Sequence, residues 1–281
     1  MFRKLLMVLP FLAALCGTSM AQLRVPNVSP YAAVKQSIGM STIEINYFRP
    51  SARGRKVFGE GGIVPFGEAW RAGANSATKI ILSDDFNVRN EVLAKGEYAL
   101  LAIPLSDRCE LQFYPYDSQN WLSYGPKSPV LTVLADVNET AGFKETFSIS
   151  LENVMLNTAN LVLHWGNLQA TLPMEVEIDT RVMSQIERVM KGPSNNDYFQ
   201  AALFMHERGI DLKKALEYIQ KVTNNKDALF FQVHREALIL SDLGKAEEAI
   251  VAAQRSMKLS DEAGNQDFVR LNQRLIEKLK N

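Results

Sequence analysis

Residues 42–47 read Thr-Ile-Glu-Ile-Asn-Tyr, a strict alternation of polar and apolar side chains. This period of two is typical of a β-strand with one buried face. The same alternation, or a short apolar run bounded by turn residues, recurs at 77–83, 86–89, 98–103, 110–114, 130–137, 144–151, 161–165 and 168–176. Because no amphipathic helix separates these runs, the pattern favours an antiparallel β-sandwich or barrel over a parallel α/β fold.

The hydrophobic pattern changes near residue 178. From Val182 to Met190 the apolar residues follow a period of 3.6 and lie on one face of a predicted helix. Further helical stretches follow to the end of the chain. The sequence therefore predicts a two-domain α+β protein, with a β domain at 22–178 and a small all-α domain at 179–281.

The all-α domain carries an internal repeat. Three pairs of small residues recur 34 or 35 residues apart: Ala202 and Ala237, Gly209 and Gly244, and Ala215 and Ala249. This spacing predicts two helix-turn-helix units, at 194–222 and 227–259, closed by a cap helix over 268–279. The small residues of the segment 236–249 resemble those of the tetratricopeptide repeat family. That resemblance implies helix pairing and a groove for an extended segment of a partner protein, with packing against the β domain as the alternative.

The first 21 residues differ in composition from the rest. A basic start precedes an apolar run, and Ser19 and Ala21 supply the small residues that a signal peptidase reads. We therefore expect a signal peptide at 1–21, cleaved near Ala21, and a periplasmic or secreted protein. A lipoprotein anchored at Cys16 is less favoured, because a leucine precedes that cysteine.

Composition argues against several classes of function. The 31 basic and 31 acidic residues balance, so no nucleic-acid partner is expected. No run after the first 21 residues approaches the length of a membrane span. The three histidines lack the spacing of metal-binding motifs, so we expect neither a metal nor a cofactor. Removal of the signal peptide leaves Cys109 as the single cysteine, which excludes an intramolecular disulfide.

A long loop at residues 49–75 joins two predicted strands and is rich in glycine, arginine and apolar residues. Connections of this length inside compact domains usually carry a function, and arginine forks suit a carboxylate or a phosphate. The candidate ligand-binding residues are therefore Arg49, Arg55, Trp70, Arg71 and Asn75, joined by Trp121 from a later segment. In the alternative interpretation, the loop packs across one end of the domain and its arginines bond main-chain carbonyls.

A second segment, residues 114–124, combines tyrosines and Trp121 with the amides of Gln119 and Asn120. This composition suits a sugar-binding surface, where flat rings cover apolar sugar faces and amides bond hydroxyls. It also occurs in loops that merely close a β-sandwich. The two segments form one pocket only if they lie at the same end of the domain, which the sequence does not decide.

Four motifs follow one another along the β domain. They are Arg49-Pro50, Gly54-Arg55-Lys56-Val57-Phe58-Gly59, Pro65-Phe66-Gly67-Glu68-Ala69-Trp70-Arg71-Ala72-Gly73-Ala74-Asn75 and Gly96-Glu97-Tyr98-Ala99-Leu100. Over about residues 29–170 they resemble an exported, uncharacterised family, the domain of unknown function 2911. The resemblance implies an envelope location in the Bacteroidetes group, often with appended helical repeats. The family has no assigned activity, so it implies no role for any residue.

These observations favour an extracytoplasmic binding or scaffolding protein that is not an enzyme. Its β domain would hold an anionic or carbohydrate-like ligand, and its helical tail would pack or dock a protein partner. The alternative is an envelope hydrolase acting on glycan or peptide, with Glu68 as acid or base, or Glu60 and Glu68 paired with Asp84 and Asp85. A third hypothesis is an interaction protein whose β domain holds no small ligand.

Overall fold

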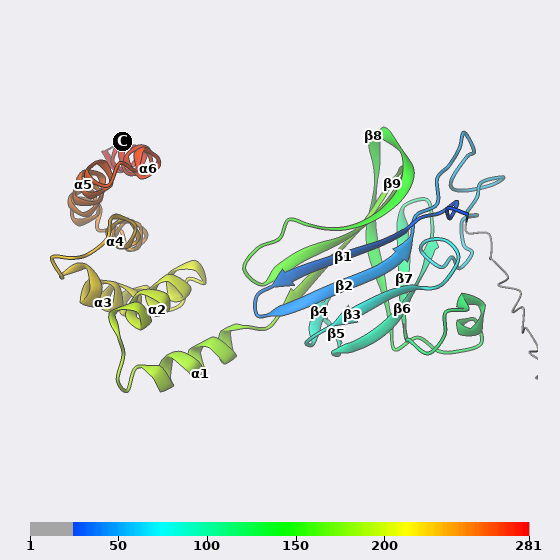
Figure 1. Cartoon of the computed structure of the whole chain (residues 1–281), viewed down its shortest axis with the longest axis horizontal. Coiled ribbons are helices and arrows are strands. Elements are labelled where there is room, and N and C mark those ends of the chain that lie inside the picture. Colours follow the sequence, from blue (N-terminus) through cyan, green and yellow to red (C-terminus); the bar gives the residue numbers. More distant parts are fainter. Residues whose placement is uncertain (1–24, 281) are drawn as a thin grey trace, which may run out of the picture. The chain divides into compact units, whose positions relative to one another are not determined.

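The computed structural model describes residues 25–280, so the expected signal peptide at 1–21 lies outside the described residues. The chain separates into two compact units between Val176 and Glu177. Nine strands make up the first, here called the β unit, and six helices make up the second, the helical unit (Figure 1). No helix within the described range is long and apolar enough to cross a membrane.

The β unit is one continuous antiparallel sheet. Its strands are β1 (Tyr31–Ile38), β2 (Ser41–Phe48), β3 (Thr78–Leu82), β4 (Phe86–Val88), β5 (Glu91–Leu93), β6 (Gly96–Pro104), β7 (Arg108–Pro115), β8 (Leu131–Glu152) and β9 (Thr158–Val176). They follow the order β1-β2-β3-β6-β7-β8-β9-β4-β5, and every neighbouring pair is antiparallel. A short 3₁₀ helix, η1 (Trp121–Tyr124), follows β7.

The antiparallel β domain expected from the sequence is confirmed, but as an open sheet with β1 and β5 at its edges. The strands expected at 130–137 and 144–151 are parts of β8, which is 22 residues long and pairs with the 19-residue β9. Register shifts between Glu139 and Ser148 interrupt this pairing. Because such irregularities bend a strand without ending it, one long curved sheet takes the place of a sandwich or closed barrel.

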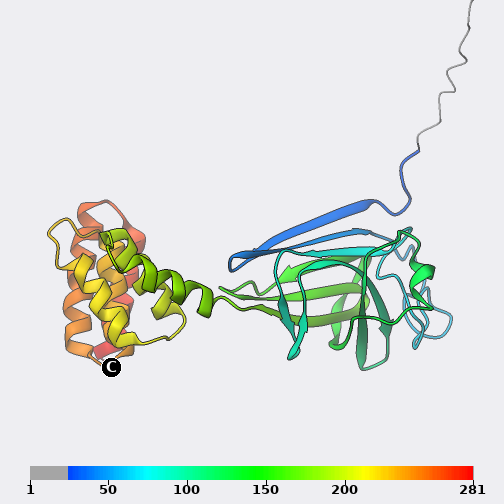
Figure 2. The same ribbon diagram turned by 90° about the horizontal axis from the view of Figure 1, so that it is seen from below.

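The sheet folds back on itself, so that β2 faces β8 (Figure 2). The Tyr47 hydroxyl donates to the Ile149 carbonyl at 3.2 Å and accepts from the Ile149 amide at 2.9 Å. Beyond the end of β2, a single bridge joins Ser51 to Thr146. The inward faces of the strands and the loop after β2 enclose the core between these two parts of the sheet.

The loop at 49–75 is an ordered part of this core. Its small and apolar residues Ala52, Val57, Val64 and Ala72 are buried. Trp70 also exchanges two main-chain hydrogen bonds of 2.8 Å with Ala102 on β6. These contacts fix the loop against the sheet, so the side chains along it have defined positions.

The helical unit contains α1 (Asp179–Val189), α2 (Asn195–Glu207), α3 (Leu212–Thr223), α4 (Phe230–Asp242), α5 (Ala246–Glu262) and α6 (Gln266–Lys280). Consecutive helices from α2 to α6 pack on each other around one apolar core. Gly209 and Gly244 stand just past α2 and α4 with φ of 63° and 73°, which ends each helix in the left-handed conformation that glycine tolerates. The helical packing is thus as expected, while its nature as a repeat stays a prediction.

A buried polar network joins the last three helices. Asn272 on α6 donates to the Ser256 hydroxyl on α5 at 2.9 Å, and its carbonyl oxygen lies 2.8 Å from Nδ1 of His234 on α4. Because the Asn272 oxygen can only accept, His234 carries its proton on Nδ1. All three helices are therefore held in register by specific hydrogen bonds as well as by packing.

Candidate functional site

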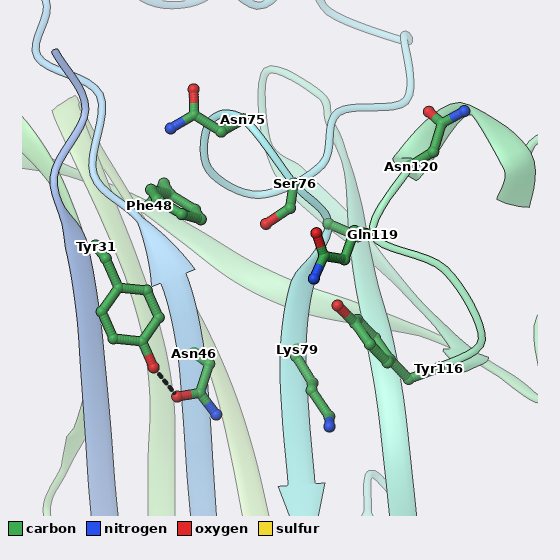
Figure 3. A pocket seen from close by; sticks show the side chains of 10 residues that line it. Tyr31, Asn46, Phe48, Asn75, Ser76, Lys79, Tyr116, Gln119 and Asn120 are labelled. Atoms are coloured by element: carbon green, nitrogen blue, oxygen red, sulfur yellow. Dashed lines mark hydrogen bonds between the residues drawn. The ribbon is translucent and has the colours of Figure 1, made fainter. Parts of the chain in front are cut away.

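A pocket of about 600 Å³ opens on the outer face of β1, β2 and β3 (Figure 3). Its floor follows from strand alternation: Ile45 and Ile80 are fully buried, so their neighbours Asn46 and Lys79 face outward. The register sets Asn46 directly opposite Lys79 on the adjacent strand. An amide and an ammonium therefore lie side by side beneath the opening.

Aromatic side chains stand on both sides of this floor. Tyr31 and Phe48 are opposite each other on β1 and β2, with ring centroids 5.7 Å apart in an edge-on arrangement. Tyr116 stands on the far side of Lys79 in Figure 3. Because β1 and β3 are two strand spacings apart, roughly 10 Å, the floor between these rings is wide enough for a flat ligand ring.

The segment at 116–120 forms the wall that carries Tyr116. Its main chain is tied to the sheet, because the Ala77 amide donates to the Gln119 carbonyl and the Tyr116 amide to the Glu97 carbonyl, both at 2.9 Å. The buried Tyr124 hydroxyl fixes the same segment from below, donating to the Ser118 carbonyl at 2.8 Å. The loop at 49–75 and the segment at 114–124 therefore meet at one end of the domain and share this pocket.

The pocket holds one charged side chain, and that charge is compensated. Lys79 Nζ lies 2.8 Å from a Glu97 carboxylate oxygen and 4.8 Å from the centroid of the Tyr116 ring. Burial, followed by the nearby Tyr124, raises the pKa of the Tyr116 phenol, so its hydroxyl stays protonated at neutral pH. Among residues 25–280, no carboxylate lines this pocket. Its polarity comes mainly from neutral groups.

Several of these neutral groups remain open to a ligand. Across residues 25–280, the Gln119 amide and the Ser76 hydroxyl make no hydrogen bond. The other polar groups are occupied in part. The Asn46 amide accepts from the Tyr31 hydroxyl and donates to Glu44 at 3.1 Å. The Asn75 amide donates to Asn27 at 3.2 Å, and the Asn120 oxygen accepts from the Leu122 amide at 3.2 Å. Both donors and acceptors are thus available around the opening.

Residues 29–174 match the model of a family described as a protein of unknown function, DUF2911. The chain belongs to this family. No curated protein and no solved structure matches the chain. The DUF2911 domain covers all nine strands up to the last residues of β9, and it contains the whole pocket.

The six candidate residues of the DUF2911 domain fall in different environments. Asn75 lines the pocket, and Trp121 follows its last lining residue, Asn120. Arg71 does not line the pocket, but its guanidinium carbon lies 5.4 Å from the centroid of the Trp121 ring. Of the six, Asn75 therefore lines the pocket, while Trp121 adjoins the lining residue Asn120 in sequence and contacts Arg71.

The other three candidates hold the DUF2911 domain together. Arg49 donates through Nε to the Phe147 carbonyl at 2.9 Å. Arg55 donates to two carbonyls of its own turn at 2.9 and 3.0 Å. Trp70 is enclosed by aromatic rings, 4.9 Å from Phe147 and 5.6 Å from Trp165 between centroids. None of the three lines the pocket.

Sequence reasoning missed the strand residues of the pocket, namely Tyr31, Asn46, Phe48 and Lys79. A usable signal was the alternation of β2 and β3. An outward asparagine, an outward phenylalanine and an outward lysine occur on strands whose other faces are buried.

Two of the carboxylates considered for hydrolysis, Glu68 and Asp85, lie at opposite ends of β6. Glu68 follows Gly67, whose amide bonds the Pro104 carbonyl at one end of β6. Asp85 accepts from the Lys95 amide just before the other end of β6, which is nine residues long. About 25 Å of extended strand therefore separates these two positions. No cluster of His, Cys, Asp or Glu suited to a metal ion occurs in the described part of the chain.

Proposed function

We propose that the β unit is a binding module for a carbohydrate-like, polyhydroxylated ligand, carried by an exported protein. One observation supports this most directly: three aromatic side chains and four amide side chains surround one open pocket whose only charge is already paired. The aromatic residues are Tyr31, Phe48 and Tyr116, and the amides are Asn46, Asn75, Gln119 and Asn120. The export that it assumes rests on the sequence of residues 1–21.

The chemistry of sugars fits this lining. The C–H faces of a pyranose ring are apolar and flat, so they pack on aromatic rings, while the hydroxyls at its edge both donate and accept hydrogen bonds. Amide side chains offer both kinds of partner in a fixed plane. The neutralised Lys79–Glu97 pair favours a hydroxyl over a small free anion in the centre of the floor.

The same lining favours binding over glycoside hydrolysis. Glycoside hydrolysis by the usual route needs two carboxyl groups about 5 to 10 Å apart around the bond that breaks. The pocket offers none. The envelope-hydrolase alternative and the docking of a protein partner by the helical unit stay predictions without a supporting contact.

Replacement of Tyr116 by alanine tests the proposal. The chain expressed from residue 22 is screened against an array of neutral and acidic oligosaccharides, and affinities for those that bind are measured by calorimetry. We expect Tyr116→Ala to weaken binding about 2- to 13-fold, because a stacked aromatic ring contributes on the order of 0.5–1.5 kcal/mol.

The matched control is Phe143→Ala, which removes an exposed aromatic ring of β8 that does not line the pocket. Its affinity should equal that of the original chain. A screen in which no oligosaccharide binds contradicts the proposal, as does equal weakening by both substitutions.

A further inference from the structure

Arg71 occupies an unusual position beside the pocket. The residue before it, Trp70, is bridged to β6 by two main-chain hydrogen bonds, and the three residues after it are buried. Its backbone is therefore fixed. The guanidinium carbon of Arg71 lies over the Trp121 ring, 5.4 Å from the ring centroid. This cation–π contact holds the guanidinium against the Trp121 ring.

The hydrogen-bond donors of this guanidinium are not used by the protein. Nε of Arg71 is the one buried side-chain nitrogen or oxygen among residues 25–280 that lacks a partner. Its two terminal nitrogens also make no hydrogen bond within that range, and they are not enclosed, so they remain open to solvent. No ion pair of the described chain includes Arg71.

The remaining arginines of the loop provide a comparison within the same loop. Arg49, Arg53 and Arg55 each donate to at least one main-chain carbonyl. Their guanidinium groups link different parts of the backbone, and the carbonyl oxygens that accept these hydrogen bonds partly offset their positive charge. Arg71 has no such role, although it stands on the same loop.

This arrangement leaves a positive charge in a partly desolvated place without a counter-charge. Burial lowers the pKa of the Arg71 guanidinium, and no neighbouring carboxylate opposes that effect. Buried polar groups in proteins nearly always have hydrogen-bond partners. A buried group without one therefore indicates a water, ion or ligand at that position. Two parallel N–H groups at the open end of a guanidinium match the two oxygens of a carboxylate.

We propose that Arg71 and Trp121 form an oxyanion subsite, which accepts the carboxylate of an acidic sugar bound in the neighbouring pocket. The inference rests on the proposed function and narrows its ligand class to glycans that contain uronic acids. Its position supports this: Arg71 lies four residues before Asn75, and Trp121 directly follows Asn120, both of which line the pocket. The Trp121 ring lies against the guanidinium, whose terminal nitrogens stay available to the ligand.

The experiment compares ligands that differ only in charge. Uronic-acid oligosaccharides and their methyl esters are titrated into the chain from residue 22 and into Arg71→Gln, Arg71→Lys and Arg108→Gln. Arg108 serves as the matched control, because it is an exposed arginine at the start of β7, outside the pocket. Thermal unfolding of each variant shows whether it is folded, and Arg71→Lys keeps the charge if Arg71→Gln does not fold.

We expect the acid to bind about 10- to 150-fold more tightly than its ester, since a charged hydrogen-bonded contact contributes on the order of 1.5–3 kcal/mol. Arg71→Gln should abolish this difference and leave ester binding unchanged. Arg71→Lys should keep part of it, because an ammonium lacks the bidentate geometry. Arg108→Gln should behave as the original chain.

The failures of the two proposals look different. Equal binding of acid and ester, with no effect of Arg71→Gln, overturns the subsite and leaves the sugar pocket standing. Absence of binding by both ligands contradicts both proposals. If inorganic phosphate stabilises the original chain but not Arg71→Gln while no sugar binds, Arg71 is an oxyanion site separate from any glycan, and the assignment to acidic sugars is overturned.

Discussion

At the scale of the residue, Cys109 shows how burial controls reactivity. Its side chain is buried on β7, and desolvation, followed by the nearby Glu110, raises the pKa of the thiol to about 12. At pH 8 only about one thiol in 10⁴ is then ionised, and the thiolate is the reactive form. We expect Cys109 to resist iodoacetamide in the folded protein and to be alkylated fully in guanidinium, as measured by peptide mass spectrometry. Alkylation of native Cys109 within minutes would contradict this.

The residues of the pocket differ in how far the sequence reveals them. Asn75, Gln119 and Asn120 stand in segments whose composition is unusual, so those segments attract notice on composition alone. Asn46 and Lys79 are ordinary outward residues of amphipathic strands, where polar side chains are expected in any case. Only the pairing of β2 with β3 brings these two together, and that register comes from tertiary structure.

A similar limit applies to the loop arginines. Judged by residue type alone, Arg49, Arg55 and Arg71 are equally good candidates to bind an anion. Whether an arginine is occupied depends on which carbonyls the folded backbone places near it, and those come from residues as distant as Phe147. The sequence therefore indicated the segment but not which of its arginines lacks a hydrogen-bond partner among the described residues.

At the scale of the element, the loop depends on a close approach of its backbone to β2. A Cβ added to Gly73 would lie 2.9 Å from the Phe48 carbonyl oxygen and 3.1 Å from the Thr78 hydroxyl. We expect Gly73→Ala to destabilise the β unit by about 1–3 kcal/mol, since the backbone must shift to relieve the overlap. Denaturant unfolding followed by tryptophan fluorescence measures this loss.

Gly142→Ala is the control for that substitution, because a Cβ there meets no atom within 4 Å. It should change the free energy of unfolding by less than about 0.5 kcal/mol. A Gly73→Ala protein as stable as Gly142→Ala would show that the stability of the β unit does not depend on the close approach of the loop to β2.

The network between α4, α5 and α6 makes the helical unit sensitive to acid. Burial lowers the pKa of His234 from its ordinary value of 6.5, and the charge of Arg235 acts in the same direction, while the hydrogen bond with Asn272 opposes them. The unfolded chain therefore takes up a proton at higher pH than the folded one. The contribution of His234 to stability is complete above about pH 6.5 and is lost as the pH falls from there through the folded pKa.

Circular dichroism at 222 nm during urea unfolding measures this effect between pH 5 and 7.5. We expect the stability of the helical unit to decline toward pH 5 in the original chain. In His234→Gln, which keeps a donor for Asn272, that decline should be smaller. An unchanged pH dependence in the variant would exclude His234 as its source.

Sequence patterns located most strands but not their limits. The edge strand β1 was missed because its side chains are exposed or half-buried up to Ile38, so it shows no buried face. β5 has three residues, too few for a period to appear. The residues between the two halves of β8 are mostly exposed and polar, so they resemble a turn, and only pairing with β9 keeps them extended. The hydrophobic pattern of a sequence thus reveals which face of a strand is buried, whereas the length of the strand depends on the strand with which it pairs.

At the scale of the whole molecule, the two units can be followed separately in one sample. All three tryptophans, Trp70, Trp121 and Trp165, belong to the β unit, and the α-helices belong to the helical unit. Fluorescence and circular dichroism at 222 nm therefore report on different units of the same chain. A single free energy of unfolding for the full chain is not a defined quantity unless both signals change together.

The strand order also determines when each strand can find its partner during synthesis of the chain. β1 and β2 can pair once residue 48 has been made, whereas β4 waits for β9, because Phe86 pairs with Val176, 90 positions later. At translation rates of about 5–20 residues per second, that interval lasts roughly 5–20 s. Throughout it, Phe86, Val88 and Leu93, all buried in the finished domain, lack their final cover. The β4–β5 hairpin of the nascent chain thus exposes apolar side chains until almost the whole domain has been translated. We therefore expect a chaperone to bind the nascent chain at this hairpin.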